Sequence, residues 1–293
     1  MTADHVDESI SLAEVRQAGR AVHLEYHWVG VPDETAPLVV FLHEGLGSAS
    51  MWRRFPAKLC EAGGCRGLVY SRAGYGRSTP RSHGERWTPD YMHVQAEEVL
   101  PALLVAAGID VERKRPWLFG HSDGASIALI YAATFPAAAA GLVLLAPHIF
   151  VEDLSVRSIE RAKVAYGSTE LRGKLARHHQ DVDSAFWGWN DIWLDPAFRD
   201  WNIESLLPSV RVPVLAVQGH DDEYGTMAQV DGLCAGVPWA EVIKLDDCAH
   251  SPQRDQPAAV TAAAIDFIRR HESTASRSTQ AQQTSSHREE TST

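Results

Sequence analysis

The sequence is poor in several features that would point to particular classes of protein. Its four cysteines form no C-x-x-C pair and do not cluster with histidines, so we expect neither a disulfide framework nor a metal site. We interpret all four as the reduced thiols of a cytoplasmic protein: Cys60, Cys65, Cys234 and Cys248.

Charge and hydropathy argue against two classes of partner. The formal net charge is −11 and no long basic run appears, whereas nucleic-acid binding needs clustered Lys and Arg. No apolar run reaches the length of a transmembrane helix, and residues 1–10 are polar and acidic, without an apolar segment for secretion. We therefore expect no nucleic-acid partner and no membrane partner.

What the chain does contain is enough apolar material for one large core. Hydrophobic residues make up 45 % of the 293 positions. One domain with an insertion is more natural for this length than two domains, since α/β folds often exceed about 200 residues.

Apolar runs alternate with helical stretches along most of the chain. The runs expected to form strands are a pair within residues 11–28 and further ones at 38–42, 67–70, 117–119, 141–146, 213–218 and 241–245. This alternation predicts an α/β fold with a mostly parallel central sheet flanked by helices. In such sheets the functional side chains follow the carboxyl ends of the strands.

The stretch 148–210 has no strand-like run, only helical segments. It therefore divides the predicted core into a first part, residues 1–147, and a second part, residues 211–272. The last helix is expected to end near His271. Residues 273–293 are rich in Ser, Thr, Gln and charge, and we expect a disordered tail there because they cannot bury enough apolar surface.

A G-x-S-x-G motif stands where one buried strand should turn into a helix. Residues 120–124 follow the apolar run 117–119 and precede a good helix-forming stretch, the context that makes this motif specific. The turn is too tight for side chains at its outer positions, so Ser122 projects from a strained bend as the predicted nucleophile. Asp123 is the poorer choice, because His121 would then occupy a position that needs a small residue.

A serine hydroxyl is a weak nucleophile without a base. His250 is favoured because it lies in the loop between the last strand and the last helix. His121, next to the serine, is expected to point away across the turn. Asp222, at the G-x-x-D position after a strand, is the predicted carboxylate that orients the imidazole, with Asp221 as the alternative.

With these residues in the order Ser, Asp, His, the chain resembles the α/β-hydrolase superfamily, in particular its capped, esterase-like members. The resemblance rests on residues 43–48, 71–78, 120–124, 219–222 and 249–250. It implies an α/β-hydrolase fold in which residues 148–210 form a helical cap over Ser122. It also implies an oxyanion hole made by the backbone N–H groups of Gly45 and Asp123, where losing one donor typically costs ~2.7–4 kcal/mol.

Glu44 departs from the family pattern, which usually has glycine after the histidine at position 43. We expect its carboxylate to form an ion pair with Arg72 or Arg77 that braces two loops. The sharper alternative makes Glu44 a substrate-binding residue that repels anionic substrates or contacts a polar group.

Tryptophans are concentrated in the insertion. Trp187, Trp189 and Trp193 are candidate substrate-binding residues that would line an apolar acyl or aromatic pocket, although packing of the cap onto the core is the plainer interpretation. This composition predicts a small substrate with an apolar part.

The sequence thus favours a serine hydrolase that cleaves carboxylic esters through an acyl-enzyme, without a cofactor or a metal. A carbon–carbon bond hydrolase, a lactonase or a thioesterase would use the same triad, and these alternatives stay open. A non-catalytic hydrolase-fold receptor is disfavoured by the complete triad. Both a monomer and a dimer are compatible with the sequence.

Overall fold

The computed structural model describes the backbone of residues 10–290 and the side chains of residues 10–273. Its eight strands are β1 (Ser11–Gln17), β2 (Arg20–Gly30), β3 (Leu38–Leu42), β4 (Arg66–Tyr70), β5 (Trp117–His121), β6 (Gly141–Leu145), β7 (Val214–Gly219) and β8 (Glu241–Leu245). All the predicted strands are present, with ends that shift by up to two residues.

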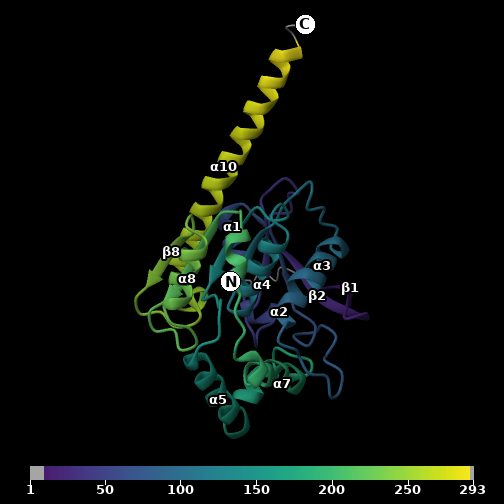
Figure 1. Cartoon of the computed structure of the whole chain (residues 1–293). Coiled ribbons are helices and arrows are strands. Elements are labelled where there is room, and N and C mark those ends of the chain that lie inside the picture. Colours follow the sequence, from purple (N-terminus) through teal and green to yellow (C-terminus); the bar gives the residue numbers. More distant parts are fainter. Residues whose placement is uncertain (1–9, 291–293) are drawn as a thin grey trace, which may run out of the picture.

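The strands form one sheet with the order β1-β2-β4-β3-β5-β6-β7-β8 (Figure 1). β2 pairs antiparallel with β1 and with β4, and every pairing from β4 through β8 is parallel. The predicted mostly parallel α/β sheet is therefore confirmed. Because β3, β5, β6 and β7 are buried along their whole length, they are apolar on both faces rather than alternating.

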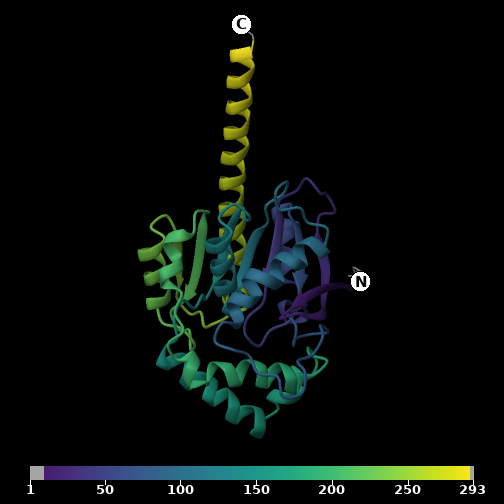
Figure 2. The ribbon, with the colours of Figure 1, turned by 45° about the vertical axis from the view of Figure 1, so that its right-hand side comes forward.

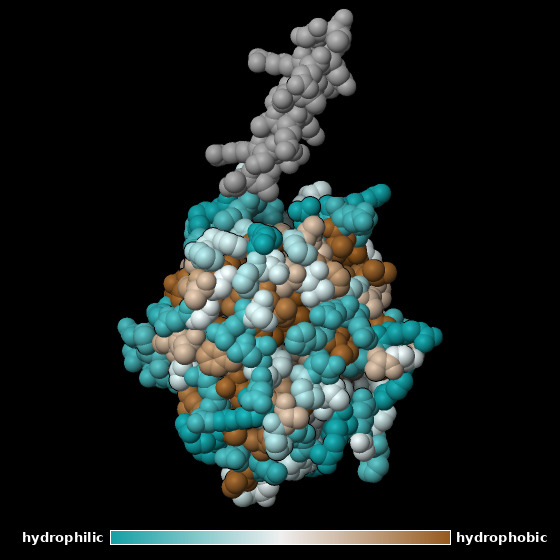
Figure 3. All heavy atoms as spheres, viewed as in Figure 1, coloured by the Kyte–Doolittle hydropathy of each residue, from teal (hydrophilic) through white to brown (hydrophobic). Residues whose placement is uncertain are grey.

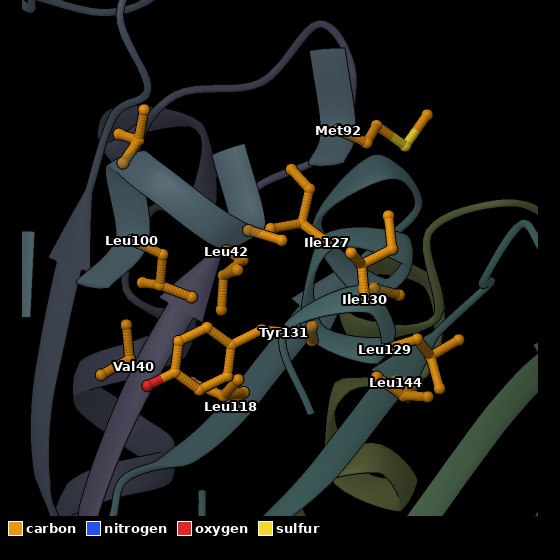
Figure 4. Close-up of a cluster of buried hydrophobic side chains, with 14 of the residues drawn as sticks. Val40, Leu42, Met92, Leu100, Leu118, Ile127, Leu129, Ile130, Tyr131 and Leu144 are labelled. Atoms are coloured by element: carbon orange, nitrogen blue, oxygen red, sulfur yellow. The ribbon is translucent and has the colours of Figure 1, made fainter. Parts of the chain in front are cut away.

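Helices cover both faces of the sheet. One face packs against α2 (Tyr91–Val94), α3 (Leu100–Ala106), α4 (Asp123–Thr134) and α8 (Ala228–Gly236), and the other against α1 (Phe55–Gly63) and the start of α10 (Pro257–Glu290). Figure 4 shows the first of these cores, where Val40 and Leu118 from the strands meet Ile127 and Tyr131 from α4. The buried α4 begins directly after the predicted nucleophile and so fixes its position.

The helical stretch before β5 is interrupted by a single π-helical turn, η2 (Gln95–Val99), between α2 and α3. Pro101 follows this turn as the second residue of α3. Proline has no N–H to donate to the carbonyl group four residues earlier, which explains why the regular pattern changes at this point.

Between β6 and β7 the chain forms α5 (Asp153–Ser168), α6 (Leu171–Leu175), α7 (Val182–Trp193) and two 3-10 turns, η3 (Pro196–Phe198) and η4 (Glu204–Ser209). We call residues 148–210 the cap segment. In both ribbon views α5 and α7 lie beyond one end of the sheet, opposite the end from which α10 projects (Figures 1 and 2). A further 3-10 turn, η1 (Ala49–Trp52), follows β3.

The last helical region corrects one prediction. After the short α9 (Pro252–Asp255), α10 continues to Glu290, so the last helix extends beyond the predicted end near His271. Residues 291–293 of the predicted tail lie outside the described residues. The prediction considered only the burial of apolar side chains, whereas this stretch lacks Gly and Pro and contains Ala, Gln, Arg and Glu, which favour helix.

The surface offers no large apolar area on the face shown in Figure 3, where hydrophobic residues are scattered among hydrophilic ones. The large exposed apolar side chains are spread over separate elements, for example Leu12 on β1, Val105 on α3 and Val164 on α5. Scattered apolar residues of this kind are normal for a protein surface. No described helix combines the length and the apolarity that a bilayer crossing requires.

Candidate active site

Ser122 lies in the sharp turn between β5 and α4. Its backbone has φ 53° and ψ −120°, a conformation that L residues rarely adopt and that a nucleophile elbow requires. A side-chain carbon at Gly120 would lie 2.4 Å from the carbonyl oxygen of Gly124, and one at Gly124 would lie 2.1 Å from that of Leu42. The glycines are therefore required by close approach of the backbone, and the strained conformation falls on the serine itself.

The imidazole of His250 stands between Ser122 and Asp222. Its Nε2 lies 2.9 Å from the Ser122 Oγ, and its Nδ1 lies 2.8 and 2.9 Å from the two carboxylate oxygens of Asp222. Because a carboxylate only accepts, Nδ1–H donates to Asp222, and Nε2 is left to accept from the serine hydroxyl. The structure thus brings together three predicted residues that come from loops far apart in the sequence.

Asp222 is held by more than the histidine. Its Oδ1 accepts from the N–H groups of Tyr224 (2.8 Å) and Gly225 (3.1 Å), and its Oδ2 accepts from the Gln218 side-chain amide (2.7 Å). Burial alone would raise the pKa of Asp222, but the imidazole of His250 and these donors lower it below its usual value. The alternative carboxylate, Asp221, is exposed, and its N–H donates to the Cys248 carbonyl instead.

The contact between Asp222 and His250 also changes the pKa of the imidazole. Burial would lower the pKa of His250, whereas the charge and the hydrogen bond of Asp222 raise it, and the net effect is a pKa above the usual value. A carboxylate in this position favours the protonated form of the His250 imidazole.

The two predicted oxyanion donors belong to Gly45 and Asp123, which both line the pocket beside Ser122. Within the described part of the chain, neither backbone N–H donates to a protein acceptor. Arg72, only 2 % exposed, links the two positions: its Nη2 donates to the Glu44 carbonyl (2.8 Å), and its Nη1 lies 3.7 Å from the Asp123 carboxylate. Arg72 thus braces both sides of the predicted oxyanion hole from behind.

His43 has a structural role in the same region. It accepts from the Arg72 N–H through Nε2 (3.1 Å), which leaves Nδ1–H to donate to the Glu44 carbonyl (2.7 Å). Burial, with Arg72 nearby, lowers the pKa of His43 well below its usual value, so the ring stays neutral. The Arg72 contact ties the turn after β3 to the loop after β4, and the Glu44 contact fixes the turn itself.

Glu44 does not pair with Arg72 or Arg77, so that prediction was wrong. Its Oε2 instead lies 3.5 Å from Nδ1 of His121, and the carboxylate folds back over Gly47. Arg72 takes the Glu44 carbonyl rather than its side chain, because the buried Asp123 attracts the guanidinium the other way. Burial would raise the pKa of Glu44, but the imidazole of His121 outweighs it and lowers the pKa to about 2.

His121, which was expected to point away from Ser122, lies at the wall of the pocket. Its Nε2 lies 2.7 Å from the His250 carbonyl oxygen, and its Nδ1 lies 3.0 Å from the Gln253 side-chain nitrogen. With Nε2 bound to a backbone carbonyl, His121 is placed to hold the His250 loop rather than to act on Ser122.

The site opens into a cavity of about 290 Å³ between the core and the cap segment. The cap side of this cavity is mostly apolar: apart from His148 and Ser155 it consists of Ile159, Ala162, Leu171, Leu175, Trp189 and Trp193. The pocket end is formed by His148, Tyr224 and Arg254, which sequence reasoning missed. Of these, His148 could have been suspected, since it follows β6 closely; burial lowers its pKa to about 3, so it is neutral.

Among the candidate tryptophans, Trp189 and Trp193 line this cavity and Trp187 does not. Trp187 packs edge-on against Tyr166 and Phe186 within the cap segment. Residues four apart share a face of a helix, whereas a residue two positions away points elsewhere. Helical periodicity on α7 therefore separates Trp187 from the other two, and its assignment to the substrate pocket was wrong.

A family comparison agrees with this geometry. The family model described as "Alpha/beta hydrolase family" matches residues 39–264, which is most of the chain. The chain belongs to the alpha/beta hydrolase family. Among curated proteins, none matches the sequence of this alpha/beta hydrolase at a significant level.

Solved structures give the same fold. A thermophilic esterase from Thermogutta terrifontis is 19% identical, with a TM-score of 0.68 over 90% of this chain and 99% of that chain. The enol-lactonase from Burkholderia xenovorans LB400 is 19% identical, with a TM-score of 0.67 over 87% and 99%. Proline iminopeptidase from Mycobacterium smegmatis is 19% identical, with a TM-score of 0.66 over 90% and 100%. At such low identity these likenesses show the fold alone.

Within the described residues, no group of three His, Cys, Asp or Glu side chains is placed to hold a metal ion. The polar groups that surround Ser122 are instead bound to one another, as described above for Asp222, His250 and His121.

Proposed function

We propose that this alpha/beta hydrolase cleaves carboxylic esters of small, partly apolar substrates through an acyl-enzyme. The observation that carries the proposal is the continuous contact from Ser122 through His250 to Asp222 at the base of a cavity of about 290 Å³. That volume lies at the small end of the range for ligand sites, about 300–1,000 Å³. The apolar cap side favours an acyl or alcohol group without charge.

In the proposed reaction, the Ser122 hydroxyl attacks the ester carbonyl while His250 Nε2 takes its proton. The carbonyl oxygen becomes an oxyanion held by the N–H groups of Gly45 and Asp123. His250 then gives the proton to the leaving alcohol, and the acyl group remains on Ser122. Water, activated by the same imidazole, releases the acid and restores the serine.

Glu44 supports a restriction on the substrate. Its carboxylate is 24% exposed at the pocket wall, next to Gly45, and its pKa of about 2 keeps it ionised at neutral pH. A second carboxylate on the acyl group would meet this charge in a partly dry cavity, where like charges repel strongly. We therefore propose Glu44, with Trp189 and Trp193, as substrate-binding residues that select neutral acyl groups.

The first experiment measures hydrolysis of p-nitrophenyl acetate and butyrate by the wild-type chain and by Ser122→Ala. A fluorophosphonate probe, followed by mass mapping of the labelled peptide, identifies the nucleophile independently of the substrate. We expect turnover that depends on Ser122 and labelling of Ser122 alone. Labelling of Ser122 without turnover of any ester would contradict the ester assignment but would still support Ser122 as the nucleophile.

A lactonase or a thioesterase would use the same residues, as would a carbon–carbon bond hydrolase. A panel containing a small lactone, a thioester and a vinylogous diketone separates these reactions from ester cleavage. The proposed selection of neutral acyl groups by Glu44, the charge rule, is tested by comparing p-nitrophenyl butyrate with an ester that carries a carboxylate at the end of its acyl chain. Glu44→Gln should raise activity on the charged ester relative to the neutral one, and an unchanged ratio would exclude the rule.

A further inference from the structure

A second cavity, of about 580 Å³, lies between the core and the cap segment. Its described lining shares no residue with the catalytic pocket. The core side comes from β2, from η1 and from the loop after β4, and the cap side comes from residues 176–180 between α6 and α7. We call it the seam cavity.

The seam cavity is strongly cationic. Arg53 and Arg77 line it from the core and Arg177 from the cap segment. Within the described part of the chain, none of these three guanidinium groups forms an ion pair with a carboxylate. All three residues are exposed, so their guanidinium groups are accessible to a ligand from solution.

The one carboxylate residue in the described lining, Glu25, forms hydrogen bonds to neutral groups of the core. Glu25 is 5% exposed, and its Oε1 accepts from the Ser71 hydroxyl (2.5 Å) and from the Arg77 N–H (2.9 Å). Glu25 thus organises the loop after β4 and does not neutralise the guanidinium groups.

The pKa of His178 is affected by arginines from both sides of the seam cavity. Its pKa is lowered first by burial and then by the positive charges of Arg53 and Arg177, which belong to the two opposite sides of the seam. The ring keeps one contact to the core, from Nδ1 to the Ser50 Oγ at 2.9 Å. Repulsion between like charges around one cavity is relieved when an anion lies between them.

Two further residues of the lining, His179 and Gln180, connect the cap segment to the core. The Gly76 N–H donates to His179 Nδ1 (3.0 Å), and the Gln180 N–H donates to the Gly76 carbonyl (2.7 Å). The neighbouring helix α6 supplies Leu171 and Leu175 to the catalytic pocket. A ligand in the seam cavity would therefore act on the position of two residues that line the catalytic pocket.

We propose that the seam cavity binds a small ligand with several anionic oxygens, such as a phosphate ester or a polycarboxylate. Arg53, Arg77 and Arg177 are its charge partners, because the planar guanidinium fork matches the oxygens of phosphate and carboxylate. The cavity volume suits a ligand of this size. Binding joins the core to the cap segment and stabilises the folded chain by mass action.

The test is a calorimetric titration of the full chain carrying Ser122→Ala, first with inorganic pyrophosphate and then with citrate, at constant ionic strength. We expect saturable binding of at least one of them with one site per chain. Arg177→Gln and Arg77→Gln, made separately, should each weaken that binding at least about tenfold, the loss of a charge-assisted contact. The matched control is Arg113→Gln, at an exposed arginine that pairs with Asp110.

Preference for pyrophosphate assigns the site to phosphate esters, and preference for citrate assigns it to carboxylates. Absence of saturable binding by both, or an equal effect of Arg113→Gln, overturns the proposal. Thermal midpoints of all variants establish that each one is folded. Because the titration uses a serine variant, its outcome does not depend on whether the enzyme cleaves esters.

Discussion

The two sides of the catalytic pocket are built in opposite ways. The core side carries Ser122, His250 and Asp222 with their hydrogen-bond partners, all placed after strands or at the start of a buried helix. The cap side presents aliphatic and indole groups such as Leu175 and Trp189. We therefore expect the core side to carry the chemistry and the cap side to limit the size of the substrate.

The core side itself contains two histidine–carboxylate pairs, and only one has the geometry of a base. His250 lies 2.8 Å from Asp222 and keeps Nε2 for the serine. His121 lies 3.5 Å from Glu44, and its Nε2 is occupied by the His250 carbonyl. We expect substitutions at the first pair to abolish turnover and substitutions at the second to adjust it.

The largest effect should come from Ser122→Ala. Removing the nucleophile leaves only binding and the oxyanion donors, so kcat should fall by at least about 10⁴-fold on every ester. Steady-state assays with p-nitrophenyl butyrate measure this loss. Ser168→Ala, at an exposed position of α5, is the matched control on the cap side and should keep full activity.

Asp222→Asn should follow, with a fall in kcat of about 10⁴-fold. An amide can donate to Nδ1, which favours the wrong imidazole tautomer and removes the charge that stabilises the imidazolium. The neighbouring Asp221→Asn is the control, because its carboxylate makes no contact with His250 among the described residues. Equal losses in the two variants would contradict the assignment of Asp222.

Arg72→Met tests the support behind the oxyanion hole. We expect kcat to fall about 10²-fold, comparable to the loss of one oxyanion donor. The free energy of unfolding should also fall by about 3–5 kcal/mol, since the buried Asp123 loses its cation. Adding Asp123→Asn should recover part of the stability, and Arg20→Gln, at an exposed ion pair with Glu85, should change neither quantity.

Trp189→Leu addresses the cap side. The substitution enlarges the pocket beside Gly45, so the ratio of kcat/KM for a longer ester over the acetate should rise about tenfold, while kcat on acetate changes little. Trp187→Leu is the control on the same helix, outside the pocket. Loss of kcat on all esters for Trp189→Leu would contradict the expectation that the cap side affects only the size of the substrate.

The smallest effect concerns pH. The neutral imidazole is the base, so kcat/KM should rise with pH through the pKa of His250, which Asp222 raises above its usual value. Glu44 also raises this pKa, to a lesser extent, so Glu44→Gln should move the acid limb of the profile to lower pH. Glu61→Gln, on α1 away from the pocket, should leave the limb in place, and a shift to higher pH in Glu44→Gln would contradict the argument.

Local sequence patterns predicted most of the fold. Apolar runs located the strands because burial on both faces of a parallel sheet demands continuous apolar sequence, as in β3 and β6. The Gly120–Gly124 motif located the nucleophile because the close backbone approach there excludes every larger residue. The missed end of α10 shows the limit of that reasoning, since helix propensity continued where apolar burial stopped.

The order of strands and helices, the strained turn at Ser122 and the chain order Ser122, Asp222, His250 could all be predicted from local sequence. Three features appear only in the folded chain: Glu44 faces His121, Trp189 rather than Trp187 lines the pocket, and three arginines line the seam cavity. The reason is physical. Strand burial and turn geometry depend on neighbours along the chain, whereas these contacts join side chains from distant loops, and their geometry exists only after the loops have packed.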